Sequence, residues 1–232
     1  MRIPLLRQPL NKISLLALAV LTACSFQKEK AEENAGGNLV SKETEMAQLL
    51  EGGIQQIPNW QAHWRSIDKS FDPGAFQVYK ELEYDDLEWP EENPIQSDSP
   101  FFPHLVHHPE GGGAVDIFSY KVVIPVEGTP GFEPDSEVIY FKSNGMRERL
   151  LFIGPSGGFQ EAVWVSSDYL MVAGFFEEED GFAPVLWLIN VNDRNYTLYS
   201  NPTRVSRYPF TQYLEKKLKN ISFPKDGAES GR

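Results

Sequence analysis

The stretch EVIYFKSNGMRERLLFI, residues 137–153, contains the clearest indication of the fold. Two runs rich in apolar, β-branched and aromatic residues flank Asn144-Gly145, the dipeptide that best suits a type I′ turn. A hairpin of this kind joins two antiparallel strands through a short connection. The stretch therefore predicts a β-hairpin that turns at residues 144–145.

Strand patterns continue on both sides of this hairpin. Residues 161–176 predict a second hairpin that turns near Ser167-Asp168, and residues 184–200 predict a third that turns at residues 192–195. Residues 115–126, VDIFSYKVVIPV, predict one long strand, and alternating apolar residues predict another over 76–84. The sequence therefore predicts a mainly β fold, an antiparallel meander of about seven strands.

The number of strands restricts the architecture. Residues 160–200 are similar to one blade of a β-propeller, but a propeller needs at least four blades of four strands, about 16 strands in all. We therefore expect a β-sandwich or a single curved sheet with blade-like hairpins. Short flanking helices are predicted at 42–51, where Gly52-Gly53 would end the helix, from Asn59 onward as a possible N-cap, and at 209–220. Residues 41–223 would form one domain, followed by a disordered tail at 224–232.

The N-terminus has the pattern of an export signal. Arg2, Arg7 and Lys12 give a basic start, and residues 13–20 form an apolar core. This core is shorter than the roughly 20 residues of a spanning helix, which favours a secretory signal. Cys24, the single cysteine of the chain, follows as part of Leu21-Thr22-Ala23-Cys24. Residues 25–40 are charged and poor in apolar side chains, which is typical of a flexible tether.

The segment Leu21-Thr22-Ala23-Cys24 resembles the lipobox of bacterial lipoproteins. The resemblance implies that residues 1–23 are a signal peptide and that Cys24 becomes the acylated first residue of the mature chain. Residues 24–40 would then form a lipidated tether, and membrane lipid would be held through Cys24, because more than one acyl chain gives stable anchoring. Since Ser25 rather than Asp follows, the outer membrane is favoured. The alternative is an ordinary signal peptide with an incidental cysteine.

The charge of the chain excludes some classes of partner. Without residues 1–23 the chain keeps 18 Lys and Arg against 33 Asp and Glu, a formal net charge of −15. An acidic chain without a basic stripe repels phosphate backbones, so nucleic acid is not an expected partner. A single cysteine permits no internal disulfide, and the fold must therefore depend on its hydrophobic core, for which 29 aromatic residues supply bulk.

Two motifs with catalytic potential occur in unfavourable surroundings. Residues 154–158, GPSGG, match the G-x-S-x-G pattern of serine hydrolases, but a strand rather than a helix is predicted to follow, which favours a glycine-rich loop. Residues of the types that bind zinc occur close together along the chain. His104 and His108 have the i, i+4 spacing of a helical zinc site, but the neighbouring Pro and Gly residues disfavour a helix there. The low-weight metal candidates are His104, His107, His108 and Asp116.

Acidic clusters at residues 85–92 and 177–180 supply oxygen ligands suited to Ca²⁺, but neither has EF-hand spacing, so solvated loops are expected there. The sequence predicts no catalytic residue and no cofactor. We expect a membrane-anchored lipoprotein of the cell envelope, a non-catalytic binding or structural module with a protein or glycan ligand, bound through exposed aromatics such as Trp89 or Phe101 and Phe102. The alternatives are a metal-dependent hydrolase that uses His104, His107 and His108, and a subunit of a larger envelope assembly.

Overall fold

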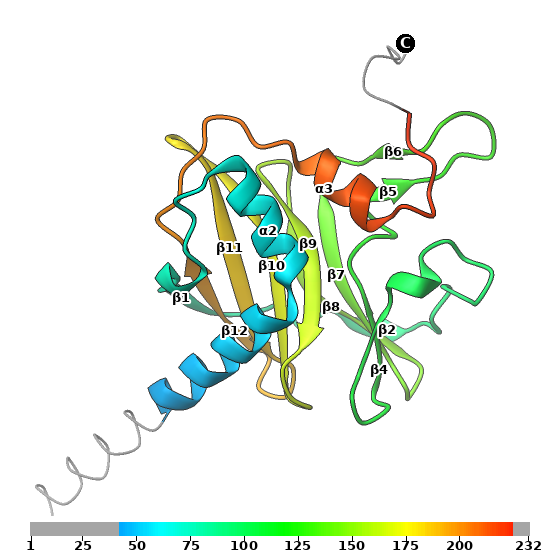
Figure 1. The fold of residues 1–232 in the computed structure, drawn as a ribbon. Coiled ribbons are helices and arrows are strands. Elements are labelled where there is room, and N and C mark those ends of the chain that lie inside the picture. The colour runs from blue at the N-terminus through cyan, green and yellow to red at the C-terminus, as the bar shows by residue number, and fades with distance from the viewer. Residues whose placement is uncertain (1–41, 225–232) are drawn as a thin grey trace, which may run out of the picture. The chain divides into compact units, whose positions relative to one another are not determined.

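A computed structural model describes residues 42–224 of the chain (Figure 1). Residues 42–56 form the first helix, and a compact unit begins within it, at Gln48. Two further α-helices flank the strands, α2 (Pro58–Ile67) and α3 (Phe210–Lys217), together with the short 3-10 helices η1 (Pro73–Ala75) and η2 (Phe102–His104). Cys24, its tether and the tail from residue 225 lie outside the described residues.

The larger of the two main sheets, sheet A, is antiparallel throughout. Its five strands are ordered β1-β12-β11-β10-β9, so that the last four strands of the chain form a meander to which β1 adds at one edge. The strands are β1 (Gln77–Glu83), β9 (Gly157–Trp164), β10 (Tyr169–Glu178), β11 (Gly181–Asn190) and β12 (Asn195–Ser200).

The second sheet, sheet B, also has five antiparallel strands, in the order β2-β8-β7-β4-β3. They are β2 (Glu88–Pro90), β3 (Val106–His107), β4 (Gly113–Asp116), β7 (Ser136–Lys142) and β8 (Met146–Ile153). A separate two-stranded ribbon pairs β5 (Val122–Val123) with β6 (Gly131–Phe132).

The prediction of a mainly β, antiparallel fold with short flanking helices is confirmed, and so are the three hairpins. The alternative of a single curved sheet is wrong, because the chain leaves sheet B after β8 and enters sheet A at β9. The described residues contain twelve strands, more than the meander of about seven that was predicted, because β2, β3 and β6 lie where no strand was predicted and the predicted strand 115–126 is divided into β4 and β5.

The long strand predicted over residues 115–126 is interrupted by a turn. The carboxylate of Asp116 accepts hydrogen bonds from the backbone N–H groups of Phe118, at 3.0 Å, and Ser119, at 3.2 Å. An Asp side chain that binds the backbone two or three residues onward offers the chain an alternative to strand pairing. The β4 strand therefore ends at Asp116, and β5 begins only at Val122.

The β7–β8 turn has a different geometry from the one predicted. Phe141 pairs with Arg147, and residues 143–145 form a three-residue loop between the strands. Only Gly145 of this loop has a positive φ, 81°, whereas a type I′ turn needs positive φ at both central residues. The hairpin prediction is thus confirmed, and the turn type is wrong.

Two details of the helix predictions are also wrong. Gly52-Gly53 does not end the first helix, which continues to residue 56. Gly53 instead permits close approach to sheet A, because a Cβ there would lie 2.5 Å from the sulfur of Met171. Asn59 is not the N-cap of α2: the helix begins with Pro58 in its first turn, and no side chain caps it.

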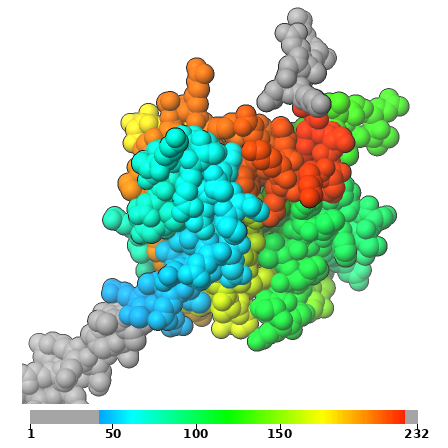
Figure 2. All heavy atoms as spheres, viewed as in Figure 1, coloured from blue at the N-terminus to red at the C-terminus, as the bar shows by residue number. Residues whose placement is uncertain are grey.

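The helical layer covers one face of sheet A, where α2 and the α3 segment lie side by side over the strands (Figure 2). The indole N–H of Trp60 donates to the side-chain oxygen of Gln160 on β9, at 3.0 Å. Trp64 stacks on Tyr208, the residue that leads into α3, with ring centroids 4.3 Å apart. The aromatic stripe of α2 therefore belongs to the core, as the periodicity of Trp60, Trp64 and Phe71 indicated.

His63 makes this helical layer sensitive to pH. Its ring is 8% exposed, lies between Tyr208 and Tyr213, and has no hydrogen-bond partner for Nε2 among the described residues. Burial and, secondarily, the positive charge of Lys216 lower the pKa of His63 to about 4, against 6.5 for the ordinary side chain. The nearby Tyr213 hydroxyl donates to the carboxylate of Glu161.

The unfolded state consequently binds a proton at His63 between pH 6.5 and about 4 where the native state does not, so acid favours unfolding. We expect the contribution of His63 to reduce the free energy of unfolding progressively as the pH falls through this window. Urea titrations from pH 8 to pH 4 would show a shallower pH dependence for His63→Phe than for the unaltered chain. Identical pH dependence of the two proteins would contradict the prediction.

Candidate functional site

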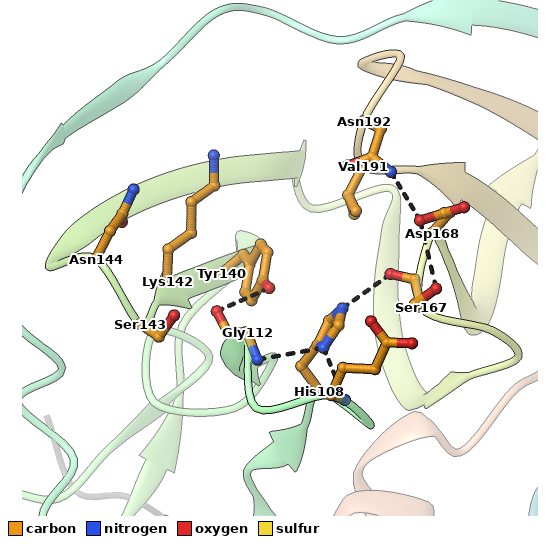
Figure 3. A pocket seen from close by; sticks show the side chains of 11 residues that line it. His108, Gly112, Tyr140, Lys142, Ser143, Asn144, Ser167, Asp168, Val191 and Asn192 are labelled. Atoms are coloured by element: carbon orange, nitrogen blue, oxygen red, sulfur yellow. Dashed lines mark hydrogen bonds between the residues drawn. The ribbon is translucent and has the colours of Figure 1, made fainter.

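Four loops meet at one end of the two sheets and line an open pocket of about 380 Å³ (Figure 3). Two loops come from sheet B, residues 108–112 between β3 and β4 and residues 143–145 between β7 and β8. The other two come from sheet A, residues 165–168 between β9 and β10 and residues 191–194 between β11 and β12. The lining residues are His108, Glu110, Gly112, Tyr140, Lys142, Ser143, Asn144, Ser167, Asp168, Val191 and Asn192. We call this cavity the loop pocket.

His108 connects the two sheets at the base of the loop pocket. Its Nδ1 accepts hydrogen bonds from the backbone N–H groups of Glu110, at 3.1 Å, and Gly112, at 3.2 Å. Since Nδ1 is an acceptor, the proton is on Nε2, which donates to the carbonyl of Ser167 at 2.8 Å. The ring also packs edge-on against Trp164, with centroids 4.6 Å apart. Both ring nitrogens are therefore occupied by structural hydrogen bonds.

The opposite wall of the pocket is held by contacts within sheet A. The side-chain amide of Asn192 donates to the carboxylate of Asp168 at 2.7 Å, and the backbone N–H of Val191 donates to the carbonyl of Asp168 at 3.0 Å. The side chain of Asn190 in turn accepts from the backbone N–H groups of Asn192 and Asp193, at 3.0 Å each. These bonds order the 191–194 loop before any ligand binds.

Lys142 extends from the loop pocket into a network of ion pairs. Its ammonium lies 2.9 Å from a carboxylate oxygen of Glu88 and 2.8 Å from one of Glu148, whose side chain is 0% exposed. Arg194 of sheet A completes the network, because its guanidinium contacts Glu88 at 2.8 Å and Glu148 at 3.3 Å. Burial works to lower the pKa of Lys142, but the hydrogen bonds to Glu148 and Glu88 outweigh it and raise the pKa.

Several polar groups of the loop pocket remain free for a ligand. The carboxylate of Glu110, the hydroxyl of Ser143 and the side-chain N–H₂ of Asn144 make no hydrogen bond within the part of the chain that the structure describes. Acceptors and donors are thus both available. Because Lys142 is neutralised by its partners, the free charge at this surface is negative, which disfavours anionic ligands.

The structure does not bring the four metal candidates into one site. His104 contacts the side-chain oxygen of Asn220 at 2.6 Å, His107 is exposed on β3, and His108 is occupied as described above. Asp116 faces its own turn at Phe118 and Ser119. Among residues 42–224, no group of three or more His, Cys, Asp or Glu side chains is placed to hold a metal ion.

The prediction that a strand and not a helix follows Ser156 is confirmed, and the loop is shorter than expected, since it comprises residues 154–156 and β9 begins at Gly157. The acidic clusters are more structured than expected. Glu178 and Asp180 contact Arg204, at 2.8 and 3.2 Å, and Asp86 pairs with Arg194. These carboxylates therefore serve as ion-pair partners for loops that are distant in sequence.

The aromatics proposed as ligand contacts lie in three different settings. Trp89 is covered by the guanidinium of Arg147, 4.8 Å from the ring, and donates to Glu91 at 2.8 Å. Phe101 packs against a buried cluster, and Phe102 is 39% exposed. None of the three lines the loop pocket.

Comparison with known proteins supplies no information on the site, so its interpretation depends on its geometry. No protein-family model, curated protein or solved structure matches this chain. In the described range 42–224, no helix has the length and apolarity needed to cross a bilayer.

Except for the His108 segment, the residues of the loop pocket were not connected with a site at the sequence level, although three of its four loops are the turns of predicted hairpins. Turn-forming residues such as Asn144, Asp168 and Asn192 mark the loops, and the strand order needed to place them together is not visible in the local pattern. The signal that existed was the common direction of the hairpins, since alternate turns of a meander lie at the same end of a sheet.

Proposed function

We propose that this chain is a lipid-anchored binding module of the bacterial cell envelope, held in the outer membrane through acylated Cys24. Its loop pocket would bind an uncharged, hydroxyl-rich ligand such as a glycan. The observation that carries the ligand assignment is the set of free acceptors and donors contributed by Glu110, Ser143 and Asn144. A hydroxyl group both donates and accepts, so such a set suits vicinal hydroxyls.

The rigidity of the loop pocket supports a binding role. Hydrogen bonds from His108 to Ser167 and from Asn192 to Asp168 hold its loops in place on both sheets. A preformed concave site binds with less loss of conformational freedom than a mobile one. The lipobox resemblance at residues 21–24 supports the location, since an acylated Cys24 would place the module at a membrane surface.

The anchor can be tested in cells of a bacterium that processes lipoproteins. We expect the full chain to incorporate radiolabelled palmitate and to fractionate with the outer membrane. Cys24→Ala should abolish the labelling and release the chain from the membrane fraction, and Cys24→Ser would serve as a second check on the sulfur. Labelling that persists in Cys24→Ala would contradict the anchor.

The ligand can be tested with soluble oligomers of N-acetylglucosamine as the probe, by isothermal titration calorimetry. Glu110→Ala removes a free carboxylate and should weaken binding about tenfold, which corresponds to one hydrogen bond to a charged group. Glu179→Ala is the matched control, because Glu179 lies in the β10–β11 turn and outside the pocket. Equal affinity of both variants, or no binding by the unaltered chain, would contradict the glycan assignment.

A further inference from the structure

A second cavity, of about 440 Å³, lies between the two sheets where β1 faces the C-terminal half of β8. We call it the apolar groove, because ten of its twelve lining residues are aliphatic or aromatic. Those ten are Tyr79, Leu82, Leu151, Phe152, Ile153, Phe159, Phe176, Trp187, Tyr196 and Leu198, and the two others are Lys80 and Glu178.

The groove exists because both sheets have an incomplete edge at this place. β1 is the edge strand of sheet A and pairs only with β12. The short β2 covers β8 only from Met146 to Glu148, so no strand pairs with the outer edge of β8 beyond that point. The groove thus lies beside two strand edges to which no further strand of the described residues is paired.

The residues deep in the groove are buried, and those at its mouth are exposed to solvent. Phe159 and Trp187 are almost completely buried and form its floor, with their ring centroids 5.0 Å apart. At the mouth, Tyr79 is 70% exposed and Phe152 is 49% exposed. Apolar surface left in water at the entrance to an apolar cavity favours occupation by an apolar ligand, which would remove that surface from solvent.

The charged residues around the groove indicate which charge the head group of a ligand would carry. The ammonium of Lys80 has no hydrogen-bond or ion-pair partner within residues 42–224. Glu178, the acidic residue of the lining, is already paired with Arg204 at 2.8 Å. The uncompensated charge of the groove is therefore positive. Glu83 and Asp85 line the neighbouring cavity together with Arg149, which is already paired with Glu137 at 3.4 Å, so a negative group would be repelled from that end and drawn to the Lys80 end.

We propose that the apolar groove binds the single hydrocarbon chain of a fatty acid, with the carboxylate beside Lys80 and the chain extended between Phe152 and Trp187. An apolar cavity whose lining includes one cation without a partner among the described residues matches a single-chain carboxylate. This site is separate from the loop pocket, with which it shares no lining residue, and the proposal does not depend on the glycan assignment.

The test uses the full chain with Cys24→Ala, so that no attached acyl chain competes for the groove. Laurate and dodecyltrimethylammonium, which share a twelve-carbon chain and differ in the sign of the head group, are titrated below their micelle concentrations by calorimetry and tryptophan fluorescence. We expect saturable binding of one laurate per chain. Dodecyltrimethylammonium should bind at least tenfold more weakly.

Three variants locate the site. Leu82→Trp places an indole into the groove and should abolish laurate binding, whereas Val78→Trp, on the same strand but outside the lining, should leave it unchanged. Lys80→Gln should weaken laurate binding about tenfold and, because a repulsive charge is removed, should strengthen the binding of dodecyltrimethylammonium. Thermal unfolding of each variant checks that the fold is retained, and a second groove variant, Leu82→Phe, replaces Leu82→Trp if that chain does not fold.

Several outcomes would overturn the proposal. These are the absence of saturable laurate binding, equal binding of the two amphiphiles, or laurate binding that persists in both groove-filling variants. Binding to phosphatidylglycerol vesicles without binding to monomeric laurate would also overturn it, and would indicate a membrane surface as the partner instead. Failure of the N-acetylglucosamine titration would leave these results unaffected.

Discussion

Replacing Trp60 with Ala is expected to lower the free energy of unfolding by about 3–5 kcal/mol, the range for aromatic-to-alanine changes in a core. Trp60 is 0% exposed and packs against Trp64, Phe71 and Phe76, with ring centroids 6.1, 6.1 and 6.3 Å away. Its loss would leave a cavity between α2 and sheet A and remove the hydrogen bond to Gln160. Urea unfolding followed by circular dichroism measures the change.

Trp89→Ala is the control for this substitution. Trp89 is a half-buried residue on the edge strand β2, and its main contacts are with Arg147 and Glu91. Because a partly exposed cation–π contact and a solvent-accessible hydrogen bond each contribute about 1 kcal/mol, its removal should have a much smaller effect. Equal losses in the free energy of unfolding for Trp60→Ala and Trp89→Ala would mean that the aromatic residues of α2 are not central to the packing of the helical layer.

Replacing Lys142 with Met is expected to destabilise the fold by about 3 kcal/mol, because it leaves the carboxylate of Glu148 buried without its closest partner. Glu148 is 0% exposed, and Arg194, 3.3 Å away, would remain as its one cationic contact among the described residues. The measurement is chemical denaturation at low ionic strength and pH 7, where both groups are charged.

The matching test is the double variant Lys142→Met with Glu148→Leu. Removal of both charges also removes the buried carboxylate, so the double variant should recover much of the stability lost in Lys142→Met. Glu88 and Arg194, 2.8 Å apart, would still pair with one another. A double variant no more stable than Lys142→Met would show that the ion pair itself, and not the stranded charge, determines the effect.

The parts of the fold that were predicted correctly depend on interactions between near neighbours in the sequence. The three hairpins follow from alternating apolar runs and turn residues within about 20 positions of each other. The face of α3 that contains Tyr213, Leu214 and Leu218 is buried, as its helical spacing indicated. Such patterns are reliable because they depend on the spacing of residues within one strand or helix and not on the element that packs against it.

Two of the failures, at Gly53 and at the metal candidates, come from contacts that are not local, whereas Asp116 binds backbone N–H groups only two and three residues onward. Gly52-Gly53 is a helix-ending pair by propensity, but the close packing of Gly53 on Met171 of β10 makes a glycine useful inside the helix. Asp116 is an unremarkable polar residue in an apolar run until its carboxylate caps the following backbone. The metal candidates were near each other in sequence, and the fold directs His104 to Asn220 and His108 to Ser167.

The amino-acid sequence by itself determined that this protein is mainly β, where its hairpins lie, and that its N-terminus resembles a lipobox, since each of these depends on residue types at short spacing. The tertiary structure alone decided the division into two sheets and the position of the loop pocket. The hydrogen bonds that hold the lining of that pocket join residues far apart in sequence, such as His108 with Ser167 and Lys142 with Glu88, and only the packing of whole strands and sheets brings such partners together.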